Sequence, residues 1–205
     1  MSFPCVLARR ELAKRSVPRD VNVREEKRFF PSVVLDTFLD KTAIETILNC
    51  GCDQCKSHLA DLGKQDAPIK YATKITGTKS PTDAKALFAL LIYIEHPMFV
   101  VAFIERGLDS KSLESYCAQP RFQPETLEDY WPRYRQRNPK DSLYLAQKFS
   151  FSMHQFVPPV LDHGNFSVYS ADTILPFIEG ATLGSGSYGE VYPFSIYEGY
   201  NQIPV

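Results

Sequence analysis

The sequence predicts a mainly α-helical domain followed, at its C-terminal end, by a β-hairpin. Three observations lead to this prediction. Apolar side chains recur at helical spacing over much of residues 32–150. Within that range, nearly continuous apolar stretches require a core that surrounds them. After residue 175 the helical period gives way to a short, β-prone pattern punctuated by glycines.

Composition divides the 205 residues into four segments. Residues 1–31 are charged and unpatterned, which predicts a mobile arm or a frayed helix. Residues 32–150 are the predicted helical domain, 151–175 a linker, and 176–205 the hairpin segment. Hydrophobic residues make up 44% of the chain and charged residues 23%, values that exclude wholesale disorder.

The first predicted helix spans 32–48, where apolar side chains recur at i, i+3 and i+4. A short second helix over 54–62 would end at Gly63, because glycine readily adopts the left-handed conformation that follows a helix. Segments 112–118 and 125–136 are further candidate helices that could pack around the apolar ones.

The most apolar part of the chain follows a clear helix start. Ser80 can cap a helix and Pro81 suits its first position, so a helix is predicted over 84–94. This helix is apolar nearly all round and is therefore expected to be buried. Pro97 breaks it, and a second apolar helix over 98–106 follows. Because of that break, the stretch is too interrupted to span a bilayer.

Charge and cysteine content bound the environment of the protein. The net charge of −1 gives no general reason to expect nucleic acid or a membrane as a partner. Five cysteines are an odd number, which argues against a secreted disulfide framework. The N-terminus also lacks the apolar run of a signal peptide. We therefore expect a cytoplasmic protein, with the nucleus as the alternative.

A metal site is suggested by Cys50, Cys52, Cys55 and His58, four soft ligands within a short stretch of sequence. Zinc prefers tetrahedral Cys/His sets, and Gly51 would provide the turn that lets Cys50 and Cys52 converge. The compact spacing, however, departs from the usual two separated ligand pairs. The alternative is that the cysteines are buried at a helix junction and that His58 is solvated.

The C-terminal segment contains the motif G-x-G-x-x-G-x-V, formed by Gly184, Gly186, Gly189 and Val191. Dinucleotide-binding folds also use three glycines, but their loop opens a helix. Residues 190–197 are instead aromatic, contain a proline and are typical of a strand. We therefore predict a strand, a glycine turn and a second strand.

This segment resembles the nucleotide-covering loop of the protein kinase family, including its aromatic tip and its valine. The resemblance covers 176–205 and implies the first two strands of a kinase N-lobe. The segments 156–161 and 173–177, which lead into the loop, also resemble fungal kinase-domain proteins that carry a helical N-terminal region. The kinase resemblance implies that the loop binds ATP, with backbone N–H groups on the phosphates and two apolar side chains around the adenine. The implied ATP-contacting residues are Leu183, Gly184, Ser185, Gly186, Ser187, Tyr188, Gly189 and Val191.

The catalytic motifs of that family are not found in the chain. The third-strand lysine would come just after Val205, and the αC glutamate, the His-Arg-Asp loop and the Asp-Phe-Gly site are absent. No Lys or Arg follows Lys148, so nothing close in sequence can neutralise a triphosphate. The resemblance implies the N-terminal portion of an ATP- and Mg²⁺-dependent kinase acting on Ser or Thr of a protein substrate, with no catalytic residue in this chain.

Two other functions stay open. One is a non-catalytic helical interaction domain in which the glycine loop is a vestige, and the other is a small zinc-binding module. The glycine loop favours kinase ancestry, whereas the missing lysine favours a non-catalytic role. We expect weak ATP binding or none, because an isolated hairpin is marginally stable and ordering its loop costs about 1–2 kcal/mol per residue.

Overall fold

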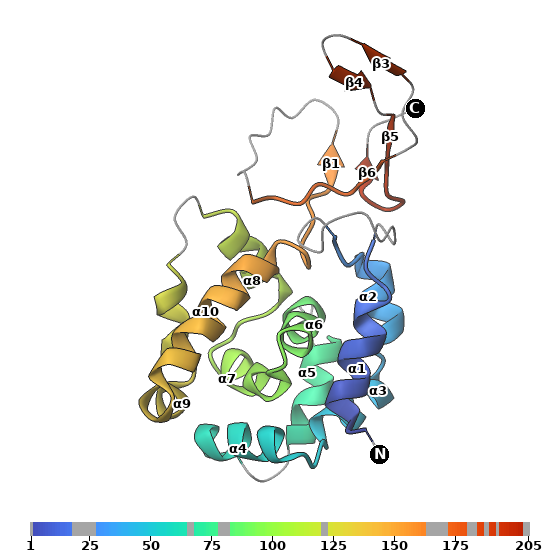
Figure 1. Cartoon of the computed structure of the whole chain (residues 1–205). Helices are drawn as coiled ribbons and strands as arrows, with labels where there is room; N and C mark the ends of the chain where they lie inside the picture. Colours follow the sequence, from blue (N-terminus) through green and yellow to red (C-terminus); the bar gives the residue numbers. More distant parts are fainter. Residues whose placement is uncertain are drawn as a thin grey trace.

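The computed structural model describes residues 2–17, 28–64, 68–77, 83–119, 123–162, 172–179, 184–186, 189–191 and 193–202. Helices form the body of the molecule, and the short strands of the C-terminal segment extend from one end of this body (Figure 1). Within the described residues, no helix combines the length and apolarity required to cross a bilayer. The mainly α chain with a C-terminal hairpin is thus confirmed.

The N-terminal part contains helices α1 (Pro4–Ala13), α2 (Ser32–Phe38), α3 (Lys41–Leu48) and α4 (Asp53–Leu62). Within residues 1–31, predicted as a mobile arm or a frayed helix, α1 is a helix whose Ala8 and Leu12 share one face and are buried in the core. The single helix predicted over 32–48 is broken in two. Asp40 leaves the helical conformation, and its carboxylate caps α3 by accepting from the Ala43 N–H at 2.7 Å.

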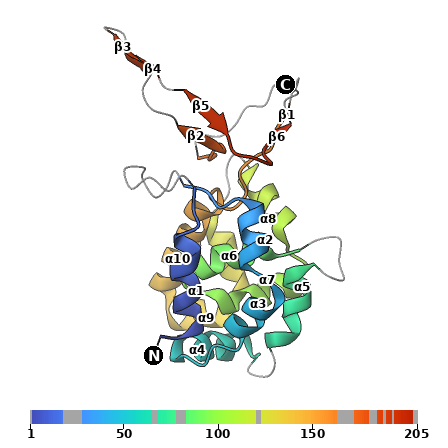
Figure 2. The same cartoon turned by 90° about the vertical axis from the view of Figure 1, so that its right-hand side faces the viewer.

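The central part contains a 3₁₀ turn (Pro68–Tyr71), α5 (Ala72–Thr76), α6 (Lys85–Tyr93), a second 3₁₀ turn (Pro97–Phe99) and α7 (Val100–Glu105). As predicted, α4 ends at Gly63 with φ 65°. The predicted start at Ser80 and Pro81 lies outside the described residues. Helix α6 is central to the body (Figure 2), and each residue from Ala86 to Ile92 is buried.

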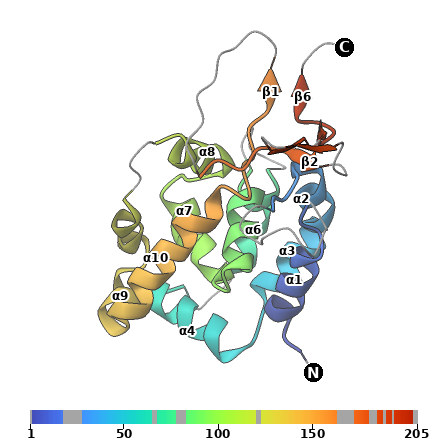
Figure 3. The same cartoon turned by 45° about the horizontal axis from the view of Figure 1, so that its top comes forward.

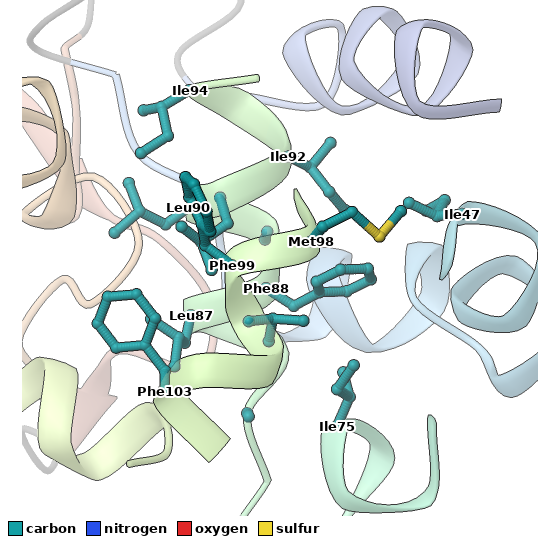
Figure 4. Close-up of a cluster of buried hydrophobic side chains, with 14 of the residues drawn as sticks. Ile47, Ile75, Leu87, Phe88, Leu90, Ile92, Ile94, Met98, Phe99 and Phe103 are labelled. Carbon is teal, nitrogen blue, oxygen red and sulfur yellow. The ribbon is translucent and has the colours of Figure 1, made fainter. Parts of the chain in front are cut away.

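Side chains from several elements surround α6. Figure 4 shows Phe88 and its neighbours on α6 between Ile47 of α3, Ile75 of α5 and the aromatic side chains of Phe99 and Phe103. All five of these residues are 3% exposed or less. The break at Pro97 therefore returns the chain against the helix that it follows, so the two apolar segments bury each other.

The last helical part contains α8 (Ser110–Cys117), a 3₁₀ segment (Pro124–Tyr130), α9 (Pro132–Arg137) and α10 (Pro139–Met153). Helix α10 was not predicted as a separate element, although Pro139 suits a first helical position. Its residues Leu145, Phe149 and Met153 are spaced four apart and buried. The helical body therefore continues past residue 150, the end of the predicted domain, and Phe156 is also part of its core.

Six short strands follow, namely β1 (Leu161–Asp162), β2 (Phe177–Glu179), β3 (Gly184–Gly186), β4 (Gly189–Val191), β5 (Phe194–Ile196) and β6 (Asn201–Gln202). β2 pairs with β5 and β3 with β4, both antiparallel, in two separate two-stranded sheets. The β3–β4 pair lies between β2 and β5 in the chain, so the two pairs are nested as in a hairpin. β1 and β6 lie side by side in parallel (Figure 3).

Candidate functional sites: a cysteine cluster and a glycine hairpin

Four cysteine thiols lie together where α1 meets the junction between α3 and α4. The Sγ atoms of Cys5, Cys50, Cys52 and Cys55 are all within 4.8 Å of one another. The Cys5 Sγ is 3.4 Å from the Cys50 Sγ and 3.7 Å from the Cys52 Sγ. Cys5 is partly exposed and the other three are buried, and none of the four forms a disulfide. The cluster has the donor set of a metal site.

Local structure brings these thiols together. Cys5 is the second residue of α1, and Cys50 follows α3, where its N–H donates to the Ile47 carbonyl at 3.1 Å. Cys52 is the N-cap of α4, and its Sγ accepts from the Cys55 N–H at 3.4 Å. The N-terminal ends of two helices, each of which carries a partial positive charge, therefore meet at the thiols.

The protein environment shifts the pKa values of these thiols in different directions. Burial, with hydrogen bonds to Cys50 and Cys52, raises the pKa of Cys5 to about 12. Burial likewise raises the pKa of Cys55. For Cys50, burial opposes ionisation, but hydrogen bonds with the backbone of Cys52 and Cys5 and with their thiols outweigh it and lower the pKa. Among these three thiols, Cys50 ionises most readily.

His58, the fourth ligand that the sequence predicted, does not belong to the cluster. Its ring stacks on His96 and Phe99, with centroid separations of 4.7 Å and 4.6 Å. At 3% exposure, His58 is also not the solvated histidine of the alternative interpretation. The fourth thiol beside Cys50, Cys52 and Cys55 is that of Cys5, which was not among the predicted ligands.

The stacked histidines form a separate buried polar site. The Nδ1 atoms of His58 and His96 are buried and have no hydrogen-bond partner among the described residues. Burial lowers the pKa of His58 to about 4 and the pKa of His96 to about 3. Asp61, on the same helix as His58, forms an ion pair with Arg137 of α9. Both imidazoles are therefore neutral near pH 7.

The glycine motif lies at the far end of the hairpin. Gly184 pairs with Val191, Ser185 with Glu190, and Gly186 with Gly189. Only two residues connect the last pair, the shortest common connection in a β-hairpin. Of the predicted ATP-contacting residues, Leu183, Ser187 and Tyr188 lie outside the described part of the chain. Gly184 is exposed, and a Cβ added to it would meet no atom within 4 Å.

The base of the hairpin contacts the helical body through two tyrosines. The Ser32 N–H at the start of α2 donates to the Tyr200 hydroxyl at 2.9 Å. Phe29 packs edge-on against Tyr197 and Tyr200, with centroid separations of 5.7 Å and 6.1 Å. Leu161 of β1 adds a backbone bond to the Tyr200 carbonyl at 2.8 Å. Tyr200 therefore connects the hairpin, β1 and α2.

No protein-family model, no curated protein and no solved structure matches this chain. Within the described residues, the cysteine cluster in the helical body and the glycine hairpin beyond it are features to which a function can be assigned.

Proposed function

We propose that this chain is the N-terminal portion of an ATP-dependent protein kinase, a transferase that phosphorylates Ser or Thr of a protein substrate in the cytoplasm. The observation that carries the proposal is the pairing of Gly186 with Gly189 across a two-residue connection. This pairing places the glycines of the motif at the tip of a hairpin. A dinucleotide-binding loop would instead lead into a helix, whereas residues 189–191 and 194–196 are strands.

In this proposal, the hairpin covers the phosphates of ATP. Glycine has no side chain to obstruct the approach, so backbone N–H groups can reach the phosphate oxygens. The open space around Gly184 fits this role. The kinase resemblance implies that Leu183 and Val191 contact the adenine. Mg²⁺ accompanies ATP in the intact parent, where it neutralises the phosphate charge.

The hairpin supplies positioning but no charge neutralisation. Residues 149–205 contain five acids and no Lys or Arg. Phosphoryl transfer requires cations around the phosphates, which this segment does not contain. We therefore assign no catalytic residue to the chain and propose that the lysine, the catalytic aspartate and the metal ligands belong to a following part of the parent protein.

Transcript sequencing beyond the codon for Val205 tests the kinase proposal directly. We expect a third strand with an Ala-x-Lys sequence, followed by His-Arg-Asp and Asp-Phe-Gly motifs. A stop codon at that point would contradict the kinase proposal and favour the non-catalytic interaction domain, with the glycine loop as a vestige.

In the longer protein, Gly184→Ala provides a second test. The structure has room for the added methyl group, so the fold should persist while the approach to the phosphates narrows. We expect a several-fold higher KM for ATP. Ser195→Ala is the matched control, because Ser195 is exposed on the same hairpin, in β5, outside the glycine motif. Equal KM values for the two variants would count against a phosphate-binding role.

A second candidate function is that of a zinc-binding helical module, and the cysteine cluster is the observation that favours it. This candidate is compatible with the kinase proposal because the cluster lies in the helical body. Metal analysis of the protein purified without chelator tests it: bound zinc is the expected result, and its absence would remove this candidate.

A further inference from the structure

We propose that one Zn²⁺ is bound by the four thiolates of Cys5, Cys50, Cys52 and Cys55, and that this ion fastens α1 to the α3–α4 junction. The inference rests on the zinc-binding candidate above and is independent of the kinase proposal. It replaces the predicted ligand His58 by Cys5, and it gives the metal a structural role.

The distances between the thiols fit a single tetrahedral ion. With Zn–S bonds of about 2.3 Å, the sulfur atoms of a regular tetrahedron lie about 3.8 Å apart. The Sγ of Cys5 lies 3.4 Å from that of Cys50 and 3.7 Å from that of Cys52, and all four sulfurs lie within 4.8 Å of one another. Only small side-chain rotations are needed to close this set around an ion.

The spacing of the ligands also fits zinc once Cys5 is included. Cys52 and Cys55 have the C-x₂-C spacing of a zinc-ligand pair, and the Cys55 N–H already donates to the Cys52 sulfur. Cys50, two residues before Cys52, adds a third sulfur from the same junction. Cys5 adds the fourth from 45 residues before Cys50, so one ligand comes from a separate part of the chain.

Charge and burial favour a closed, structural site. Four thiolates around a divalent ion leave a net negative charge, which the N-terminal ends of α1 and α4 stabilise. Each of these helices is ten residues long. Since three ligands are buried and all four are thiols, no coordination position remains for water or substrate. An all-sulfur set also disfavours Mg²⁺ and Ca²⁺, which prefer oxygen ligands.

The ion would hold the N-terminal end of α1. An isolated helix of this length is only marginally stable in water, so α1 depends on its tertiary contacts. Farther along the helix these include the buried Ala8 and Leu12, a hydrogen bond from Arg9 Nε to the Tyr93 carbonyl at 3.1 Å, and an exposed ion pair between Arg9 and Glu95. Exposed ion pairs contribute little to stability. The thiol cluster is therefore the contact that a metal ion can strengthen most.

Metal content and cobalt substitution test the ligand set. We expect one zinc per chain in the full 205-residue protein purified without chelator. Cys5→Ser should weaken zinc binding at least about tenfold. His58→Gln and Cys117→Ser are the controls and should keep the full zinc content, because neither residue belongs to the cluster. The protein loaded with Co²⁺ alone should show the absorbance of a tetrahedral site with four thiolates.

Alkylation of the wild-type protein gives a test that does not depend on the folding of a variant. Zinc should protect Cys5 from iodoacetamide although Cys5 is partly exposed, whereas Cys117, also partly exposed, should react equally with and without zinc. Zinc-loaded protein in which Cys5 still reacts freely, together with a Cys5→Ser variant that keeps its metal, would overturn the assignment of Cys5 but not zinc binding. Metal-free protein, or a disulfide between Cys5 and Cys50, would overturn both.

Discussion

Helix α6 and strand β5 bury very different fractions of their side chains. Every residue from Ala86 to Ile92 in α6 is buried, whereas Phe194 of β5 is 61% exposed. The helical body is therefore stabilised by apolar burial on all sides of a central helix. The hairpin depends on backbone pairing, on the contact between Phe177 and Phe194, and on Tyr200 at its base. We infer that the body can fold without the hairpin but that the hairpin needs the body.

Large-to-small substitutions should separate the two regions most strongly. Phe88 is fully buried, so Phe88→Ala should lower the free energy of unfolding by about 3–5 kcal/mol through lost burial and a cavity. Phe194→Ala is the matched control, and it should change that free energy by about 0.5 kcal/mol or less. Urea unfolding measures both values. Similar losses for the two variants would show that the hairpin is as tightly packed as the body.

Acid should destabilise the body through its buried histidines. In the unfolded chain His58 has its ordinary pKa of 6.5, whereas burial lowers it to about 4 in the folded protein. Between these values the unfolded chain binds the additional proton, so the free energy of unfolding falls as the pH drops. Above pH 6.5, where His58 is neutral in both states, it does not lower the free energy of unfolding. By pH 4 its protonation has lowered that free energy by about 3 kcal/mol. Because burial lowers the pKa of His96 further, to about 3, its protonation continues to lower the free energy of unfolding toward pH 3.

His58→Phe isolates this effect, because phenylalanine keeps the stacking on Phe99 but does not titrate. Urea unfolding of both proteins at about pH 7 and about pH 4.5 is the measurement, and we expect a clearly smaller loss in the variant. Carboxylates contribute equally to both proteins and cancel in the comparison. Parallel losses would mean that His58 is not held neutral in the folded state.

Removal of a single hydroxyl group should weaken the contact between the helical body and the hairpin. Tyr200→Phe removes the acceptor for the Ser32 N–H but keeps the ring against Phe29. We expect a cost of about 1 kcal/mol and faster amide exchange in β5 and β6, with α6 unchanged. Amide exchange followed by mass spectrometry resolves these segments. Unchanged exchange in β5 and β6 would show that this hydrogen bond does not stabilise the hairpin.

The smallest expected effect is the heat of Mg-ATP binding to this chain. Residues 149–205 offer no cation, and ordering the glycine loop costs conformational entropy. We therefore expect no low-micromolar affinity in a calorimetric titration. Low-micromolar binding would mean that the hairpin, held against the helical body, can bind ATP without further cations. It would contradict the proposal that the cations belong to a following part of the parent protein.

Where sequence reasoning succeeded, the signal was local. The end of α4 at Gly63 and the break at Pro97 depend on the backbone preferences of single residues. Burial of α6 follows from its apolar composition. Helix α10 had an equally local signal in Pro139 and in its apolar residues at every fourth position, although it was not predicted as a separate element. The break at Asp40 was missed because apolar periodicity continues across a helix cap.

The sequence by itself determined the hairpin, because β-prone segments and glycine turns can be recognised from a few neighbouring residues. Only the tertiary structure decided the membership of the cysteine cluster. His58 is three residues from Cys55, yet it faces His96 and Phe99, while Cys5 reaches the cluster from 45 residues before Cys50. A metal site requires sulfur atoms at matched distances, and those distances depend on how α1 packs against the rest of the body.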